Sequence, residues 1–270
     1  MKRHIFYYTA KELAPFIDWS YFLHAWGIGA HSKGEKEAVE IVEEAKKVLD
    51  KLDKKVCARA MFALCDAHSH GDNIIIEGKA LPMLRQQHST KGEPCLCLSD
   101  FIAPKEDKIG LFATCAGEEI TEMHCDDPFL GLVAQTVASR LAEAAATLMH
   151  RDVRTKRELW GYAPDEELTP QELNLEKFQG IRPAVGYPSL PDQSIIFSID
   201  KILSLDRIGI TLTANGAMFP HAAVCGMMIS HPAARYFAVG NITDEQLADY
   251  AARRSMPVEK IQKFLIKNIG

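Results

Sequence analysis

The feature that most constrains the fold of this chain is a long, alanine-rich run over residues 129–150. Alanine loses no side-chain entropy in a helix, so the run predicts the strongest helix of the chain. Because its side chains are mostly small, we expect this helix to pack closely against a sheet or another helix. The rest of the chain must supply that partner surface.

Shorter patterns predict the surrounding elements. Thr9 and Glu12 have capping-box spacing and predict a helix over residues 9–27, which Pro15 either breaks or restarts. After a loop over residues 28–35, apolar residues at helical spacing predict a helix over residues 36–53. Further helices are predicted over residues 79–88, 191–203, 243–253 and 257–266 and directly after Thr169, and strands over residues 56–64, 73–77, 95–98, 109–114, 208–213, 222–230 and 236–242.

In this order, strands follow one another through short turns as often as through helices. The pattern favours an α+β fold, a mixed α/β arrangement with a largely antiparallel sheet and flanking helices, over a doubly wound fold. No stretch is typical of a flexible linker. We therefore expect one unit over residues 1–270, with an N-terminal helical part, about residues 1–55, packing on it.

Charge and hydropathy exclude several kinds of partner. The 31 basic and 36 acidic residues give a net charge of −5, so no nucleic acid is expected. No run approaches the roughly 20 apolar residues of a membrane-spanning helix, and the first residues do not resemble a signal peptide. We therefore expect a cytoplasmic protein with no membrane contact. The seven cysteines form no CxxC pair, and Cys65 with His68 and His70 fits no standard zinc pattern, so no metal site is predicted.

The signatures of common enzyme classes are missing: the sequence has no GxGxxG, Walker, GxSxG or HExxH motif. Residues 178–188 instead place Arg182 in a loop that two prolines stiffen and two glycines open. Proline reduces the freedom that binding would remove, and arginine offers a planar fork to a carboxylate or phosphate. The same residues also fit a surface loop in which Arg182 forms a salt bridge.

Two acidic residues have unusual surroundings. Asp18 lies among aromatic residues, where a buried carboxylate is costly unless it is paired. It is therefore either a helix-surface residue or an anion placed for a cationic ligand. Glu143 lies among small apolar residues, with Ser139 one turn earlier on the same face, and is a candidate site residue. Alternatively, Glu143 is exposed and pairs with Arg140 at i,i+3 spacing.

Several motifs, in the same order along the chain as in a known family, carry a resemblance to that family. They are Leu84-Arg85-Gln86-Gln87, the run from Cys97 to Lys105, Trp160-Gly161-Tyr162-Ala163-Pro164, the run from Gly180 to Pro188, Ala217-Met218-Phe219-Pro220, Ser230-His231-Pro232 and Tyr236-Phe237-Ala238-Val239. Together they resemble the activation domain of cobalamin (vitamin B12)-dependent methionine synthase, from about Phe16 to the C-terminus. The RPxxGYP stretch at residues 182–188 is the most specific element.

The resemblance implies a C-shaped domain around a twisted antiparallel sheet. It also implies binding of S-adenosylmethionine (SAM), which methylates cobalamin that has drifted to the Co(II) state, with an electron from flavodoxin or a similar reductant. Such a module is a methyltransferase component in methionine biosynthesis and not a complete catalyst alone. It positions SAM and contributes no acid or base of its own, so no catalytic residue is predicted.

The resemblance also assigns the ligand contacts. Arg182 matches the residue for the SAM carboxylate, and Asp18 the residue for its ammonium group. The backbone of Pro183, Ala184 and Gly186 matches the edge that reads adenine, and Tyr187 closes that loop. Glu143 matches an acid near the ligand, Tyr236 and Phe237 match an aromatic pair, and Glu176 is a weaker candidate.

Departures from the family pattern affect the expected partner contacts. Phe237 replaces a tyrosine, Ser139 stands where an aspartate often meets the cobalamin module, and His221 replaces a glycine. The chain contains no cobalamin-ligating DxHxxG stretch. We therefore expect a reactivation subunit that acts in trans on a split methionine synthase or a related cobalamin-binding module. The alternatives are a SAM-binding or corrinoid-docking protein without methyl transfer, and a structural relative whose pocket is inactive.

Overall fold

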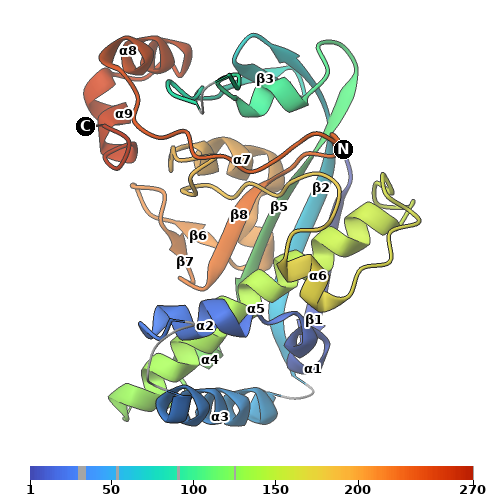
Figure 1. Ribbon diagram of the computed structural model, residues 1–270, viewed down its shortest axis with the longest axis vertical. Helices are drawn as coiled ribbons and strands as arrows, with labels where there is room; N and C mark the ends of the chain where they lie inside the picture. Colours follow the sequence, from blue (N-terminus) through green and yellow to red (C-terminus); the bar gives the residue numbers. More distant parts are fainter. Residues whose placement is uncertain (30–34, 53–54, 90–91, 125, 270) are drawn as a thin grey trace.

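The computed structural model describes residues 1–29, 35–52, 55–89, 92–124 and 126–269 (Figure 1). Its main sheet is antiparallel throughout, with the order β4-β3-β2-β5-β8, and β1 also pairs with β2. The mixed α and β fold predicted from the sequence is therefore confirmed. The strands are β1 (Arg3–Thr9), β2 (Val56–His70), β3 (Asn73–Ile76), β4 (Lys79–Pro82), β5 (Asp107–Ala116) and β8 (Ala223–Met228), and a separate hairpin joins β6 (Thr211–Leu212) to β7 (Met218–Phe219).

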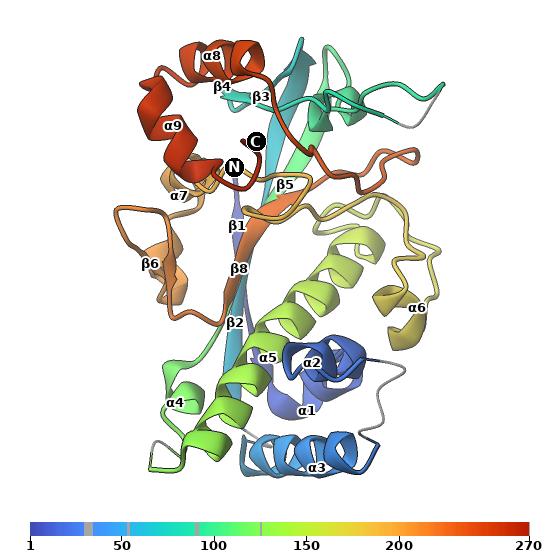
Figure 2. The ribbon, with the colours of Figure 1, turned by 60° about the vertical axis from the view of Figure 1, so that its left-hand side comes forward.

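The long strand β2 separates two apolar cores. Alternate side chains of a strand point to opposite faces, and here both faces are covered. Ala60 and Phe62 belong to one core, whereas Met61 and Ala63 belong to the other. Figure 2 shows the sheet nearly edge-on, with α5 (Pro128–Thr155) and α2 (Trp19–Ala25) on one side and α7 (Ile195–Leu203) on the other.

The helix predicted over residues 129–150 is confirmed as α5, which extends five residues further, to Thr155. Asp127 caps its N-terminus by accepting hydrogen bonds from the N–H groups of Phe129 and Leu130, and Pro128 occupies the first turn. Its buried alanines allow close packing against β2, β5 and β8. The alanine-rich run thus covers one face of the sheet, as its composition predicts.

The predicted helix over residues 9–27 is interrupted. The Thr9–Glu12 capping box forms, but α1 (Ala10–Leu13) is followed by the 3-10 turn η1 (Ala14–Phe16), and α2 begins only at Trp19. Pro15 lies in that turn, where a missing N–H costs little. The helix predicted over residues 36–53 forms as α3 (Glu35–Leu52), whereas most of the predicted loop over residues 28–35 lies outside the described residues.

Three sequence predictions for the first hundred residues were wrong or too broad. Residues 1–55 are not wholly helical, because β1 pairs with β2 from Arg3 onward. Residues 79–88 form no helix, because a turn at Gly78 reverses the chain and β4 pairs with β3. The sequence pattern of each strand alone does not indicate that it pairs with the other. Residues 95–98 form no regular strand, because only Cys97 pairs, with Arg85, before the 3-10 turn η2 (Leu98–Phe101) begins.

The C-terminal third mixes confirmed and corrected elements. Residues 236–242 form no strand, because the backbone N–H and carbonyl of Phe237 both bond to the Ser189 hydroxyl instead of a neighbouring strand. The remaining elements of the C-terminal third are the 3-10 turn η3 (Leu205–Ile208), α8 (Asp244–Arg253) and α9 (Val258–Phe264). Two short helices precede them in the chain, α4 (Glu118–Thr121) and α6 (Pro170–Asn174). None of the helices within the described ranges is long and apolar enough to cross a membrane.

Candidate functional site

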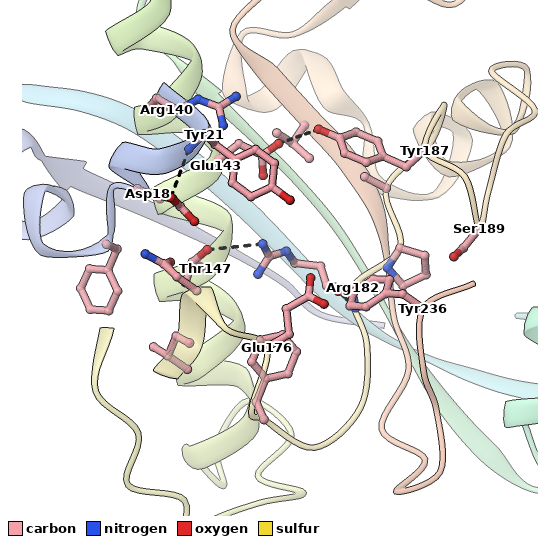
Figure 3. Close-up of a pocket in the computed structure, with 18 of the residues that line it drawn as sticks. Asp18, Tyr21, Arg140, Glu143, Thr147, Glu176, Arg182, Tyr187, Ser189 and Tyr236 are labelled. Atoms are coloured by element: carbon pink, nitrogen blue, oxygen red, sulfur yellow. Dashed lines mark hydrogen bonds between the residues drawn. The ribbon is translucent and has the colours of Figure 1, made fainter. Parts of the chain in front are cut away.

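A cavity of about 500 Å³ lies between α5, the segment joining η1 to α2, and the loop over residues 180–190 (Figure 3). We call this loop the strap. The residues predicted to bind the ligand line the cavity, except Gly186. They are Asp18, Glu143, Arg182, Pro183, Ala184, Tyr187, Tyr236 and Phe237, and the weaker candidate Glu176 joins them. Segments far apart in the sequence thus meet where the predicted site requires them to meet.

The strap follows β8 as a short, interrupted extra strand. Ile181 exchanges two backbone hydrogen bonds of 2.9 Å with Ile229. Further along, the Val185 N–H donates to the Cys225 carbonyl over 2.8 Å, and the Met227 N–H donates to the Pro183 carbonyl over 3.0 Å. These bonds fix the backbone on both sides of the cavity wall formed by Arg182, Pro183 and Ala184.

Glycines make this close approach possible. Gly180 has a φ of +81°, and a Cβ there would lie 2.3 Å from the Ile229 carbonyl oxygen. On β8, a Cβ at Gly226 would lie 2.2 Å from the Pro183 carbonyl oxygen. Gly186 (φ +85°) lies outside the wall and forms the turn, with its N–H bonded to the Leu190 carbonyl. Gly180 and Gly186 belong to the strap motif, whereas the sequence gives no signal that singles out Gly226.

Arg182 enters the cavity without a carboxylate partner. One guanidinium nitrogen, Nη2, donates to the Thr147 hydroxyl over 3.3 Å, and the backbone N–H donates to the Tyr236 hydroxyl over 2.8 Å. Across the part of the chain that the structure describes, no Asp or Glu forms an ion pair with Arg182. The alternative of a surface salt bridge is therefore wrong, and a cation faces the cavity.

Asp18 caps α2 and is not a residue on that helix. Its Oδ1 accepts from the N–H groups of Ser20 and Tyr21 at 2.9 and 3.2 Å and from the Ser20 hydroxyl. The other oxygen, Oδ2, forms no hydrogen bond within the described residues. Asp18 and Arg182 point into the cavity from opposite walls (Figure 3). The cap orients the carboxylate and leaves one of its oxygens for a ligand.

A hydrogen bond across the cavity connects α5 to the strap. The Tyr187 hydroxyl donates to Glu143 Oε1 over 2.7 Å, and Glu143 forms no ion pair with Arg140 among the described residues. Burial, and then the Glu143 carboxylate, raises the pKa of the Tyr187 phenol. The phenol therefore stays protonated and keeps donating to Glu143.

Tyr236 and Glu176 line the cavity near Arg182. Burial raises the pKa of the Tyr236 phenol, so this hydroxyl remains neutral while it accepts the Arg182 N–H. Desolvation over the cavity raises the pKa of Glu176, and the nearby Arg182 partly offsets that effect. Each of these groups belongs to the environment of the same guanidinium.

Sequence reasoning missed part of the wall. Thr147 lies one helical turn after Glu143 on α5, so i,i+4 spacing could have identified it. Tyr21 and Phe178 also line the cavity, but nothing in the local sequence distinguishes them from core aromatics. Of the departures noted above, neither Ser139 nor His221 lines the cavity: the Ser139 hydroxyl donates to the Gln135 carbonyl, and His221 packs edge-on against Phe219.

The cysteines and histidines among the described residues form no metal centre. Within the described ranges, no three His, Cys, Asp or Glu side chains gather closely enough to hold an ion. Burial raises the pKa of the Cys65 thiol to about 12, which keeps it protonated. Cys65 therefore packs as a small apolar side chain.

The fold and the cavity define a domain of mixed α and β structure. Within the described residues, its pocket presents an arginine without a carboxylate partner and a carboxylate oxygen without a hydrogen bond. Residues 9–255 match the family described as the vitamin B12 dependent methionine synthase activation domain, and this chain belongs to that family. A similar solved structure is the MetH reactivation domain bound to AdoHcy (S-adenosylhomocysteine), at 33% sequence identity and a TM-score of 0.91. That match covers 100% of this chain and 91% of the other.

Proposed function

We propose that the cavity binds SAM and that the chain thereby supports reductive methylation of cobalamin. The arrangement of Arg182 and Asp18 carries the proposal: one cation and one carboxylate oxygen face a shared cavity, and neither neutralises the other. The amino-acid end of SAM carries a carboxylate and an ammonium group, which complement these two side chains. The related domain bound to AdoHcy supports the same ligand class.

The remaining walls match the other parts of SAM. Along the extended strap, the Pro183 carbonyl and the Val185 N–H bond to β8, so the N–H of Ala184 between them points away from β8. That N–H forms no hydrogen bond within the described residues and is available to an adenine nitrogen. Tyr236 and Phe237 line the same cavity, and aromatic faces attract cations such as a sulfonium.

The chain contributes positioning and not acid–base chemistry. Cobalamin on a partner module would supply the cobalt centre that accepts the methyl group, after one electron from flavodoxin or a similar reductant has reduced it from the Co(II) state. The S–CH₃ bond breaks, its electron pair stays on sulfur, and AdoHcy remains. Arg182 and Asp18 hold the amino-acid end of SAM and the strap holds the nucleoside, which keeps the sulfonium methyl in one orientation.

Ligand binding is tested first. Isothermal calorimetry with SAM and AdoHcy compares the wild-type chain with Arg182→Ala. Loss of the guanidinium leaves the ligand carboxylate without its partner, which weakens binding by about 2–4 kcal/mol, or roughly 30- to 700-fold. Arg207→Ala, an exposed arginine on η3, is the matched control and keeps full affinity. Equal affinity in Arg182→Ala and the wild type would reject the assignment.

Methyl transfer is tested in trans. The chain is mixed with a cobalamin-binding module in the Co(II) state, SAM and reduced flavodoxin, and methylcobalamin is followed by its absorbance. We expect product only when all four components are present. SAM binding without product, in the presence of the cognate module and a chemical low-potential reductant, would instead favour a SAM-binding protein without methyl transfer. Product formation without the module would contradict a role in trans.

A further inference from the structure

A polar pair, the buried His150 and the half-buried Tyr162, lies behind the strap. His150 follows Thr147 by one turn of α5 and is fully buried. Its Nε2 is 3.0 Å from the Tyr162 hydroxyl, and its Nδ1 has no hydrogen-bond partner among the described residues. Neither residue lines the cavity, and neither contributes to ligand binding as proposed above.

Tyr162 connects His150 to the start of the strap. Its hydroxyl is 3.5 Å from the Gln179 carbonyl oxygen. It also lies 3.1 Å from the position that a Cβ would take at Gly180, so the hydroxyl packs against the bend from which the strap begins. The chain reaches Arg182 two residues later, after the double backbone anchor at Ile181.

The direction of these hydrogen bonds follows from the cost of burying an unpaired donor. When the His150 Nε2–H donates to Tyr162 and Tyr162 donates to the Gln179 carbonyl, only a lone pair on Nδ1 remains unpaired. The reverse direction would leave a buried N–H on Nδ1 and would remove the donor to Gln179. A buried N–H without an acceptor loses the hydrogen bond it makes in water, so the first direction is favoured.

The surroundings keep His150 neutral, which this direction requires. Complete burial, and then the positive charges of Arg154 and Arg182, hold the pKa of His150 well below its usual value. The Phe178 ring packs edge-on against the His150 imidazole, with 5.0 Å between the ring centroids. The Arg154 guanidinium lies over the same Phe178 ring, 4.5 Å from its centroid. Phe178 also lines the cavity, so the pair belongs to the layer that supports the binding wall.

We propose that His150 and Tyr162 are positioning residues for Arg182: they fix the Gln179 carbonyl and the Gly180 bend so that the guanidinium projects toward the ligand carboxylate. The inference rests on the proposed SAM site. Gln179 is also held through its side chain to the Ser230 carbonyl. The hydrogen bonds of the pair therefore adjust the direction of Arg182 and do not hold the strap alone.

Two ligands separate positioning from general support of the cavity. AdoHcy carries the amino-acid carboxylate, whereas 5′-methylthioadenosine has the same nucleoside and sulfur without the amino-acid end. Calorimetry with Tyr162→Phe should show AdoHcy binding weakened about fivefold to tenfold, a typical loss for one hydrogen bond, and methylthioadenosine binding changed less than twofold. Equal losses for both ligands, or none for either, would overturn the inference.

Variants of His150 provide the second arm. His150→Gln can present a side-chain N–H near the position of Nε2, whereas His150→Leu cannot. We expect His150→Gln to keep most of the AdoHcy affinity and His150→Leu to match Tyr162→Phe. Combining His150→Leu with Tyr162→Phe should add little further loss, because both disrupt one chain of hydrogen bonds. If His150→Gln binds no better than His150→Leu, the inference fails. A wild-type chain that binds neither nucleoside would remove the proposed function and this inference together.

Discussion

Gly226 is the residue on which the contact between strap and sheet depends most. An added Cβ would lie 2.2 Å from the Pro183 carbonyl oxygen and 2.8 Å from the Ala184 Cα. Both are backbone atoms and cannot rotate away. In Gly226→Ala the strap therefore has to move off β8 by about 1 Å to restore an ordinary contact.

That displacement weakens two backbone hydrogen bonds, from the Val185 N–H to Cys225 and from the Met227 N–H to Pro183. Each contributes about 1 kcal/mol, and residual overpacking costs about 1–3 kcal/mol. We expect the free energy of unfolding to fall by about 3–5 kcal/mol in total. The strap also carries Arg182, so AdoHcy binding should weaken at least tenfold, since a displacement of this size at a binding group commonly costs more.

Urea unfolding followed by circular dichroism measures the first effect, and calorimetry with AdoHcy measures the second. Gly131→Ala on α5 is the matched control, because its Cβ would meet only the His124 carbonyl oxygen at 3.4 Å. Alanine favours the helix there, so stability should rise by up to about 1 kcal/mol. A Gly226→Ala protein with wild-type stability and wild-type affinity would refute the structural reasoning.

Three further changes test other contacts. Arg154 is fully buried and forms an ion pair with Glu166. Arg154→Met should therefore lower the free energy of unfolding, measured by urea unfolding, by about 3–5 kcal/mol. A loss below about 1 kcal/mol would show that the fold does not depend on this ion pair. Because the pKa of His150 is lowered in the folded state, the unfolded chain binds the extra proton, and stability should fall as pH drops below about 6.5, by at most about 1.4 kcal/mol per pH unit. His150→Gln should lose that part of the pH dependence, and an unchanged profile would argue against it. Thr9→Ala removes the side-chain cap bonded to Glu12 and should cost about 0.5–2 kcal/mol in thermal unfolding, whereas an unchanged melting temperature would show that the cap contributes nothing.

Local signals in the sequence predicted the helices whose ends are set by nearby residues. Thr9 and Thr169 each accept a hydrogen bond from the N–H group three residues ahead, so their helices begin where the spacing indicates. The helix over residues 129–150 was predicted from its alanine content, and its Asp127 cap is seen only in the structure. The failures are non-local. The pairing of β4 with β3, and of β1 with β2, depends on segments that fold alongside, and the Ser189 hydroxyl prevents a strand at Phe237. The sequence of each segment alone does not indicate which other segment it pairs with.

In the candidate site, too, some residues could be predicted from local sequence motifs, and others matter only through contacts across the fold. The strap motif, with Arg182, is visible as a run of letters, and the family resemblance attached Asp18 and Tyr236 to it. Thr147 and Gly226 matter through contacts across the fold, to the guanidinium and to the strap backbone respectively. Their neighbours in sequence are ordinary helix and strand residues. Motifs identify the groups that touch a ligand more readily than the groups that hold them in place.

The pocket keeps two opposite charges apart. A free guanidinium and a free carboxylate oxygen in one cavity would pair with each other if their supports were flexible. Here the α2 cap fixes Asp18, and the backbone anchors at Ile181 and Val185 fix the strap that carries Arg182. No ion pair forms between the two side chains in the described structure. The zwitterionic ligand that we propose would meet both charges without first breaking a salt bridge, so we expect the rigidity of the strap to contribute directly to its affinity.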